Sequence, residues 1–204
     1  LTKATLAQSN TRYAQGGVAV VIDNMKDPGA PKLGDTVDSH VQNTLVAGAG
    51  LSDKETVGIL CAEGPAAMDE LIERGVKFDR HDGELSHGLE AAHDYPRILH
   101  AGGDATGAGI AYALIDRVRE SDIDVRTQTT VVDLIVDDPS TGSGTPRCVG
   151  VTLLGGEELR ADHVILATGG AGQLFPYTTN PAVATADGLG MALRAGVVAA
   201  DLEF

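Results

Sequence analysis

The stretch Val164–Gly196, VILATGGAGQLFPYTTNPAVATADGLGMALRAG, decides the fold class of this chain. It opens with an apolar run that ends at the turn Ala167-Thr168-Gly169-Gly170. A continuous apolar run is typical of a parallel strand that is buried on both faces. Open α/β sheets bind ligands at the carboxyl ends of such strands, where glycines let backbone N–H groups approach a phosphate or a ring. From these residues alone, a ligand-binding turn and an ordinary glycine-rich turn are equally good interpretations.

The residues before this turn predict three consecutive strands. A Pro/Gly/Ser-rich loop separates the first two, and Gly155-Gly156 is a hairpin signal between the second and the third. This β-meander favours the ligand-binding interpretation of the turn. A helix is expected to follow it, capped by Thr185 or Asp187 and ending at Gly196. The expected strands are 129–137, 147–154 and 158–168.

Periodic apolar residues predict three helices in the first half of the chain. Asp35 and Ser52 are the expected caps of the first two, and the third begins near Asp104. Gly64-Pro65 is expected to break or kink the second helix. Residues 79–100 are polar and rich in histidine, which predicts a long loop with short strands.

Composition limits the classes of partner. The chain has 204 residues and a formal net charge of -14, so binding to nucleic acid is not expected. No apolar run approaches the roughly 18 residues of a membrane helix, and the sequence opens without a targeting leader. The two cysteines, Cys61 and Cys148, have no metal-ligand spacing and suit buried thiols in a reducing cytoplasm. We therefore expect a cytoplasmic protein with a small-molecule ligand and no membrane partner.

Three motifs in a fixed order carry a resemblance to a known family. They are TRYAQGGVA at 11–19, HGLEAAHDYPRILHAGGDATG at 87–107, and the stretch at 165–196 that is followed by LEF. Together they resemble the succinate dehydrogenase and fumarate reductase flavoprotein family, in the branch that oxidises L-aspartate. The resemblance implies an α/β FAD-binding domain of the two-dinucleotide-binding type, with a Rossmann-like parallel sheet and a three-stranded β-meander.

The same resemblance implies that residues 1–204 are one FAD-binding domain fragment from the middle of a larger flavoenzyme. The family's GxGxxG loop, which opens its N-terminal βαβ unit, is not found ahead of residue 9, and the capping domain has no counterpart.

The resemblance further implies a set of cofactor-binding residues. Asn10–Gly17 would lie along the isoalloxazine ring, although Gly16-Gly17 by itself fits an edge hairpin with a bulge. The strand backbone around Val131 would meet the adenine end, and Asp187 matches an acidic position that contacts FAD while also fitting a helix cap. The implied FAD ligands are Asn10, Thr11, Arg12, Tyr13, Ala14, Gln15, Gly16, Gly17, Val131, Ala167, Thr168, Gly169, Gly170 and Asp187.

Two further positions bear on the chemistry. Asn10 stands where the succinate dehydrogenase branch carries a histidine that bonds covalently to the flavin, so the resemblance implies FAD held non-covalently. Glu90 matches a glutamate that meets the substrate amino group, although without the resemblance a surface carboxylate would be the better interpretation. The loop histidines show no metal-ligand pattern, since their separations are six, six and seven residues and no cysteine joins them, so no metal site is expected. These histidines are His81, His87, His93 and His100.

The reaction implied by the resemblance transfers hydride from Cα of L-aspartate to flavin N5 and gives iminoaspartate, with oxygen or fumarate as acceptor. The product would feed quinolinate and hence NAD synthesis, which implies a functional link to quinolinate synthase. Two alternatives remain open. One is a succinate dehydrogenase or fumarate reductase flavoprotein subunit with an iron–sulfur partner, and the other is a non-catalytic fragment or nucleotide-binding module.

Overall fold

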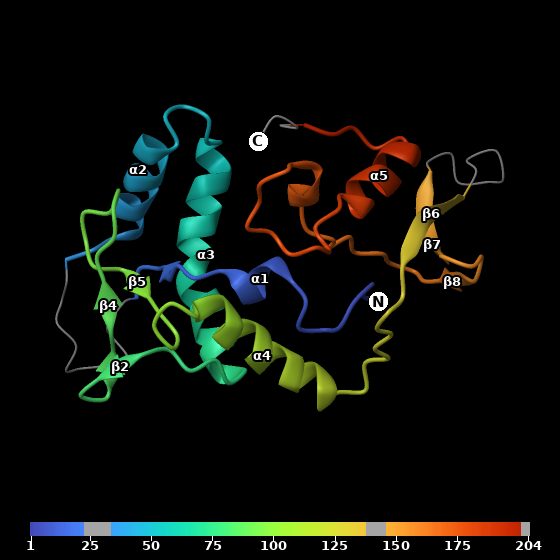
Figure 1. The fold of residues 1–204 in the computed structure, drawn as a ribbon. Helices are drawn as coiled ribbons and strands as arrows, with labels where there is room; N and C mark the ends of the chain where they lie inside the picture. The colour runs from blue at the N-terminus through green and yellow to red at the C-terminus, as the bar shows by residue number, and fades with distance from the viewer. Residues whose placement is uncertain (23–33, 138–145, 201–204) are drawn as a thin grey trace. The chain divides into compact units, whose positions relative to one another are not determined.

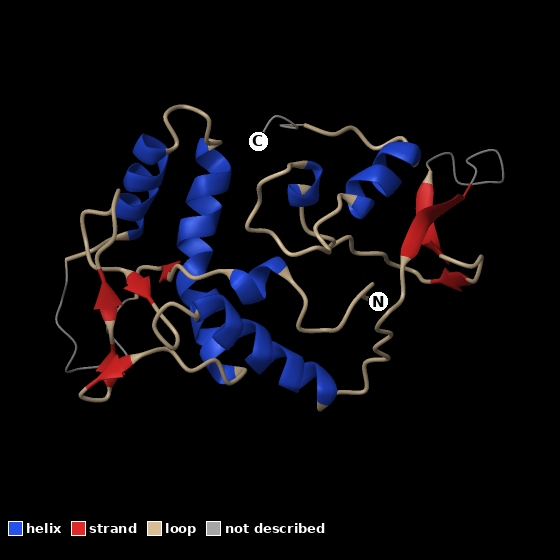
Figure 2. Cartoon of the chain, viewed as in Figure 1, coloured by secondary structure: helices blue, strands red, loops and turns tan. Residues whose placement is uncertain are grey.

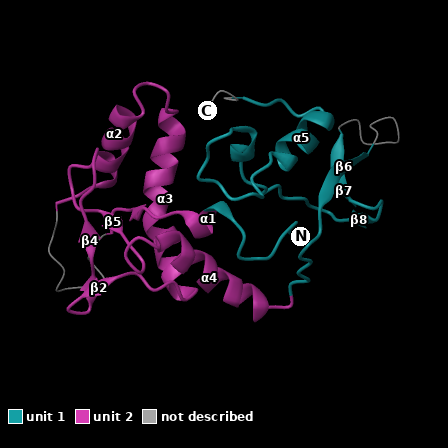
Figure 3. Cartoon of the chain, in the orientation of Figure 1, with its two compact units in different colours: residues 1–10, 123–204 teal, residues 11–122 magenta. Residues whose placement is uncertain are grey.

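The computed structural model describes residues 1–22, 34–137 and 146–200, which form two compact units (Figures 1 and 3). Unit 1 comprises residues 1–10 and 123–204, and unit 2 comprises residues 11–122. Helices and short strands occur in both units (Figure 2). In the described part of the chain, no helix is both long and apolar enough to cross a membrane.

Unit 2 consists mainly of helices. Its short strands form a three-stranded antiparallel sheet in the order β1-β5-β4, in which Val18 of β1 and His87 of β4 both pair with Leu99 of β5. This confirms the expectation of a loop with short strands over 79–100. The elements of unit 2, beginning with α1 at the unit boundary, are α1 (Asn10–Tyr13), β1 (Val18–Ala19), α2 (Val37–Ala47), α3 (Lys54–Glu73), β2 (Arg80–His81), β3 (Glu84–Leu85), β4 (His87–Gly88), β5 (Ile98–Leu99) and α4 (Thr106–Arg119).

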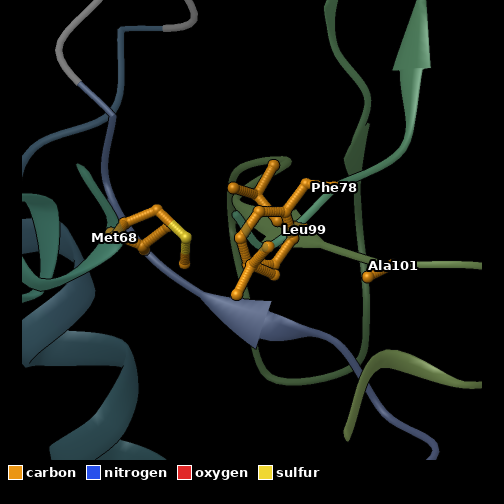
Figure 4. Packing of buried hydrophobic residues seen from close by; sticks show 6 residues of the cluster. Met68, Phe78, Leu99 and Ala101 are labelled. Atoms are coloured by element: carbon orange, nitrogen blue, oxygen red, sulfur yellow. The ribbon is translucent and has the colours of Figure 1, made fainter. Parts of the chain in front are cut away.

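The hydrophobic core of unit 2 lies between α3 and the small sheet. Figure 4 shows the side chains of Met68, Phe78 and Leu99 pointing toward one another. Leu99 is completely buried because it lies on the central strand and pairs with a residue on each neighbouring strand. Removing such side chains from water is the main stabilising contribution to a core of this size. The core therefore fixes the strand that leads directly into His100.

Two helices begin one residue later than their expected caps. Thr36 caps α2 by accepting the Ser39 N–H at 3.0 Å, and Asp53 caps α3 by accepting the Thr56 N–H at 2.7 Å. The predicted caps Asp35 and Ser52 are therefore wrong. The Asp35 carboxylate instead pairs with the buried Arg97 and accepts the neighbouring Thr36 N–H at 2.8 Å.

Of the predicted break or kink at Gly64-Pro65, the break is wrong, because α3 runs through Pro65 without interruption, and the kink stays a prediction. A proline inside a helix removes one hydrogen bond and costs about 3 kcal/mol. The helix nevertheless buries Val57, Cys61 and Met68 on one face, and burying a large apolar side chain contributes about 1.5–3 kcal/mol. The buried face of α3 thus offsets the local cost of the proline.

Unit 1 contains the expected three-stranded β-meander. Its strands pair antiparallel in the order β6-β7-β8, and the turn between β7 and β8 uses Gly155 and Gly156 at φ 113° and 91°. A positive φ is accessible to glycine at little cost, which explains the glycine pair. The elements of unit 1 are β6 (Val131–Asp137), β7 (Arg147–Leu153), β8 (Glu158–Arg160), the 3-10 helix η3 (Gly172–Leu174) and α5 (Asp187–Arg194).

The predicted strand 158–168 is only partly present. Strand β8 ends at Arg160, and the Ala161 N–H still donates to the Val149 carbonyl of β7 at 3.0 Å. Residues 162–170 join no ladder among the described residues. The side chain of Ile165 is 89% exposed. A strand of the parallel type needs neighbours on both edges and cover on both faces, and the described strands supply neither to this segment.

Helix α5 begins after Ala186, which lies at φ 61° and makes no side-chain cap. The expected capping role of Thr185 or Asp187 is therefore wrong. Asp187 is the first residue of the helix, and the Thr185 hydroxyl donates to its carboxylate at 3.0 Å. Gly196 follows the helix at φ 81°, close to its predicted end.

Candidate functional site

The segment Thr11–Gly17 lies directly on the first turn of α4. The Gly107 N–H donates to the Ala14 carbonyl at 3.0 Å. A Cβ atom on Gly107 would lie 1.8 Å from the Thr11 carbonyl oxygen, so only glycine allows this approach. Unit 2 therefore holds seven of the predicted cofactor ligands on one supported segment.

The two glycines of that segment have different surroundings. A Cβ on Gly17 would lie 2.3 Å from Ile98 Cγ2 and 2.9 Å from His100 Nε2. A Cβ on Gly16 would have no heavy atom of the described residues within 4 Å. Gly17 is thus required for packing, whereas Gly16 presents bare backbone to open space next to the exposed Gln15.

Arg12 is held by two aromatic rings. Its guanidinium carbon lies 5.2 Å from the centroid of the Tyr13 ring and 5.8 Å from that of Tyr112 on α4. Cation–π contacts of this kind contribute about 0.5–1 kcal/mol at exposed sites. They attach the side chains of α1 to the same helix that supports its backbone.

His100 lies between Glu90 and Gly17 and contacts the Glu90 carboxylate. His100 Nε2 lies 3.0 Å from Glu90 Oε1, and the same nitrogen faces Gly17. The Glu90 side chain is 49% exposed and the His100 side chain 27%. The sequence-based reasoning did not single out His100. The sequence feature that indicates His100 is its position, directly after the two apolar residues of β5 and directly before Ala101-Gly102-Gly103.

Asp79 supports the backbone around His100. Its carboxylate accepts the N–H groups of Gly102 at 2.8 Å and Gly103 at 3.0 Å. These hydrogen bonds, first the one from Gly103 and then the one from Gly102, lower the pKa of Asp79. The Asp79 N–H also donates to the His100 carbonyl at 2.8 Å. No sequence pattern indicated this role, which depends on contacts across more than 20 residues.

A buried arginine anchors the end of the loop that carries Glu90. Arg97 is 1% exposed, and its guanidinium donates to the Asp35 carboxylate from Nε at 2.8 Å and from Nη2 at 2.6 Å. It also donates to Ser39 and to Asn43 of α2. The guanidinium therefore ties α2 to the strand β5 that precedes His100.

His40 lies in the same buried surroundings as Arg97. Its pKa is lowered, first by burial and then by the positive charge of Arg97. The ring of His93 lies 5.8 Å from that of His40. In the described ranges, no group of three His, Cys, Asp or Glu side chains is placed to share a metal ion.

In unit 1, the turn Ala167–Gly170 contacts the beginning of α5. The Ala186 N–H donates to the Gly170 carbonyl at 3.2 Å, and a Cβ on Gly188 would lie 1.8 Å from Thr168 Oγ1. Asn10 is also close, because its Nδ2 lies 3.2 Å from the Cβ position of Gly169. The structure therefore brings Asn10, this turn and Asp187 into one cluster.

Asp187 is engaged within that cluster. Lys3 donates to its carboxylate, and this hydrogen bond, followed by the one from Thr185, lowers its pKa. Val131 lies elsewhere in unit 1, where it begins β6. Strand β6 contacts the opposite end of α5, through Arg194 Nε and Asp133 Oδ1 at 2.6 Å. The predicted ligands of unit 1 thus divide between the two ends of one helix.

Comparison with protein families gives one match over the whole chain. A family model described as an FAD binding domain matches residues 1–204. An L-aspartate oxidase of Streptomyces coelicolor is 45% identical over 213 residues, which cover 100% of this chain and 34% of that protein. An L-aspartate oxidase of Synechocystis is 41% identical over 208 residues, with 100% and 35% covered. The chain spans about a third of the length of these relatives.

Solved structures show the same relationship at the level of the fold. A quinol-fumarate reductase with menaquinol molecules superimposes with a TM-score of 0.81 and 27% identity, over 95% of this chain and 32% of that chain. The Mycobacterium smegmatis Sdh1 complex in its apo form gives a TM-score of 0.78 and 30% identity, over 95% and 34%. These likenesses confirm the expected fold class.

The bare backbone in each unit is compatible with FAD. A Cβ on Gly170 would meet no heavy atom of the described residues within 4 Å, as at Gly16, so at one glycine in each unit the side-chain face of the backbone is open to a phosphate or a ring. Both glycines belong to segments fixed by hydrogen bonds to a helix. The chain therefore belongs to the FAD-binding-domain family, among flavoproteins of the succinate dehydrogenase and fumarate reductase type, and its cofactor is FAD.

Proposed function

We propose that the protein containing this chain oxidises L-aspartate to iminoaspartate, with oxygen or fumarate as the electron acceptor. The observation that carries the proposal is the identity of 45% to an L-aspartate oxidase, which extends over the whole chain. A succinate dehydrogenase or fumarate reductase flavoprotein subunit is the second candidate, supported by the TM-score of 0.81 to a quinol-fumarate reductase. It is less favoured because that identity is only 27%.

Bound FAD would supply the hydride acceptor for this reaction. We propose that the backbone of Thr11–Gly17 and of Ala167–Gly170 holds the cofactor, with Val131 and Asp187 as further contacts. We also propose that FAD is held non-covalently, since Asn10 stands at the position expected for a covalently bonded histidine and an amide cannot form that bond.

We propose that Glu90 recognises the amino group of the substrate. L-Aspartate differs from succinate by one ammonium group, and an ionised carboxylate accepts a hydrogen bond from it. A hydrogen bond to a charged group contributes about 1.5–3 kcal/mol. The Glu90 carboxylate is half exposed and is held by His100 beside Gly17, so it is accessible to a ligand on that side of unit 2. Succinate and fumarate gain nothing from this contact.

The test is Glu90→Gln in the full-length flavoenzyme. The substitution keeps the shape of the side chain and removes its charge. We expect kcat/KM for L-aspartate to fall roughly ten- to a hundredfold, which corresponds to the loss of one such hydrogen bond. Fumarate reduction should persist or improve, because the dianion no longer faces a third carboxylate. Steady-state kinetics with both substrates measure the two effects.

Glu63→Gln is the matched control, because Glu63 is an exposed glutamate of α3. It should leave both activities unchanged. Equal losses of both activities in Glu90→Gln would indicate damage to the fold or to FAD binding. Wild-type activities would leave Glu90 as a solvated loop residue, and either result removes its proposed role.

We further propose a place for the reaction in metabolism. Iminoaspartate is the expected product, and its use in quinolinate and NAD synthesis would link the enzyme functionally to quinolinate synthase in the cytoplasm. Coupling the full-length enzyme to purified quinolinate synthase and measuring quinolinate tests this link directly.

A further inference from the structure

The ring of His100 packs against the backbone of two glycines, Gly17 and Gly88. Its Nε2 lies 2.9 Å from the Cβ position of Gly17, and its Cε1 lies 3.4 Å from the Cβ position of Gly88. These two glycines belong to segments that pair with β5 from opposite sides. A side chain at Gly17 would displace the imidazole, and one at Gly88 would crowd it.

The backbone of His100 is held equally firmly. His100 follows β5, whose Leu99 pairs with both neighbouring strands. Its carbonyl accepts the Asp79 N–H, and the Asp79 carboxylate binds the next turn through Gly102 and Gly103. The ring of His100 is therefore constrained by the two glycines, and its backbone by β5 and Asp79. A group that must hold one orientation needs this kind of support.

Glu90 is less firmly held, although its carbonyl accepts the His93 N–H at 3.3 Å. It lies between β4 and β5 in a segment without regular structure, and its side chain is 49% exposed. An ionised carboxylate only accepts hydrogen bonds, so the contact of 3.0 Å requires a proton on His100 Nε2. This contact uses Oε1 and leaves Oε2 as the oxygen that can meet a substrate ammonium.

We propose that His100 is a positioning residue, which holds the Glu90 carboxylate in the orientation that receives the amino group of the substrate. This inference rests on the role of Glu90 under the proposed function. His100 acts through Glu90, so its effect is confined to substrates that carry an amino group. Dicarboxylates without one bind independently of it.

A double-mutant cycle in the full-length flavoenzyme tests this inference. The variants are His100→Phe, which keeps a planar ring without the nitrogen, Glu90→Gln, and both together. His100→Phe should lower kcat/KM for L-aspartate roughly tenfold, the size expected for one hydrogen bond to a charged group. In the Glu90→Gln background the same substitution should cost almost nothing, because the group it orients has lost its charge.

Two conservative variants separate a positioning role from a structural one. Gln places its amide nitrogen near the position of Nε2, whereas Asn places its amide near Nδ1. His100→Gln should therefore restore most of the L-aspartate activity that His100→Asn loses. As a readout besides activity, titration of the oxidised flavin spectrum with succinate should give the wild-type dissociation constant in His100→Phe.

The outcomes distinguish the two proposals. A neutral Glu90→Gln variant overturns the substrate role of Glu90 and this inference with it. If Glu90→Gln is costly while His100→Phe is neutral or additive, the proposed function stands and the positioning role fails. Weakened succinate binding or an altered flavin spectrum in His100→Phe would also overturn it, since His100 would then support the fold or the cofactor.

Discussion

Gly107 and Gly16, one packed against the segment Thr11–Gly17 and the other within it, have very different surroundings. A methyl group on Gly107 would meet backbone, 1.8 Å from the Thr11 carbonyl oxygen and 2.8 Å from that of Ala14. Neither oxygen can move without shifting α1. A methyl group on Gly16 would meet no atom of the described residues. Packing therefore requires glycine at position 107, whereas at position 16 it leaves room for a side chain.

This difference gives a prediction for Gly107→Ala and Gly16→Ala in the full-length protein. Gly107→Ala should lower the free energy of unfolding of the apoprotein by about 1–3 kcal/mol, since overpacking of this kind has that cost. Gly16→Ala should leave apoprotein stability unchanged and weaken FAD binding. Thermal unfolding without FAD and fluorescence titration with FAD measure the two quantities. Unchanged FAD affinity in Gly16→Ala would remove Gly16 from the cofactor site.

Asp79 provides a prediction about pH. Hydrogen bonds from the Gly103 and Gly102 N–H groups lower its pKa in the folded state below the unfolded value of about 3.9. Its contribution to stability is therefore fully present above that unfolded value and is lost as the pH falls through the folded one. Asp79→Asn should be less stable than wild type at neutral pH, and the two stabilities should converge in acid.

Unfolding midpoints of both proteins between about pH 7 and about pH 2 measure this convergence. Asp53 and Asp187 also have lowered pKa values, but they are present in both proteins and cancel in the difference. A stability difference that does not depend on pH would show that the charge of Asp79 is not what holds the turn after His100.

At the scale of elements, α2 is attached to the sheet of unit 2 by charge as well as by apolar contact. Among the residues of α2, all of which the structure describes, only His40 is buried. Arg97 bonds Ser39 and Asn43 of α2 and also Asp35, which lies just before it. Arg97 is 1% exposed, so its charge depends on these partners. Breaking such a pair leaves an uncompensated buried charge, which costs far more than an exposed ion pair contributes.

Asp35→Asn should therefore lower the free energy of unfolding by about 3 kcal/mol or more. Asp38→Asn is the control, because Asp38 lies in the exposed first turn of α2 and should cost roughly 0.5 kcal/mol. Urea unfolding of both variants, with hydrogen exchange of the α2 amides, measures the effect. Equal losses in the two variants would mean that the Arg97 contacts contribute little to holding α2.

At the scale of the whole molecule, the two units differ in how well they bury apolar side chains. Unit 2 has a continuous core that includes Met68 and Leu99. In unit 1, Ile165 is 89%, Tyr177 93% and Val198 92% exposed. The sequence also contains no GxGxxG motif, which in dinucleotide-binding folds supplies the N–H groups for the pyrophosphate.

We therefore predict that a polypeptide of residues 1–204 binds FAD at least about tenfold more weakly than the full-length protein, since lost contacts of about 1.4 kcal/mol suffice for that factor. Fluorescence titration with FAD measures the affinity. Hydrogen exchange on the same polypeptide provides the control, because protected amides in α3 and α4 would show that unit 2 is folded. An FAD affinity equal to that of the full-length protein would contradict the prediction and show that the phosphate site lies within these residues.

Three features that depend on neighbours in sequence were predicted correctly, whereas the helix caps were not. Helix periodicity, the Gly155-Gly156 turn and the loop over 79–100 are local, because each depends on the preferences of a few adjacent residues. The order of the three motifs also indicated the family and FAD, which the comparisons confirm. The individual cofactor ligands and the substrate role of Glu90 stay predictions.

Only the tertiary structure decided the features that depend on distant residues. Asp35 is a strong cap by its residue type, but Arg97 lies 62 residues away and binds its carboxylate. Pro65 should break a helix, yet α3 continues because its buried face outweighs the local cost. The end of the predicted strand at 158–168 lacks partners, and His100 meets Glu90 only because β5 is paired on both sides. Local residue preferences change the free energy of folding by a few kcal/mol at most. Long-range contacts contribute free energies of similar magnitude, so they decide which local preference the folded chain keeps.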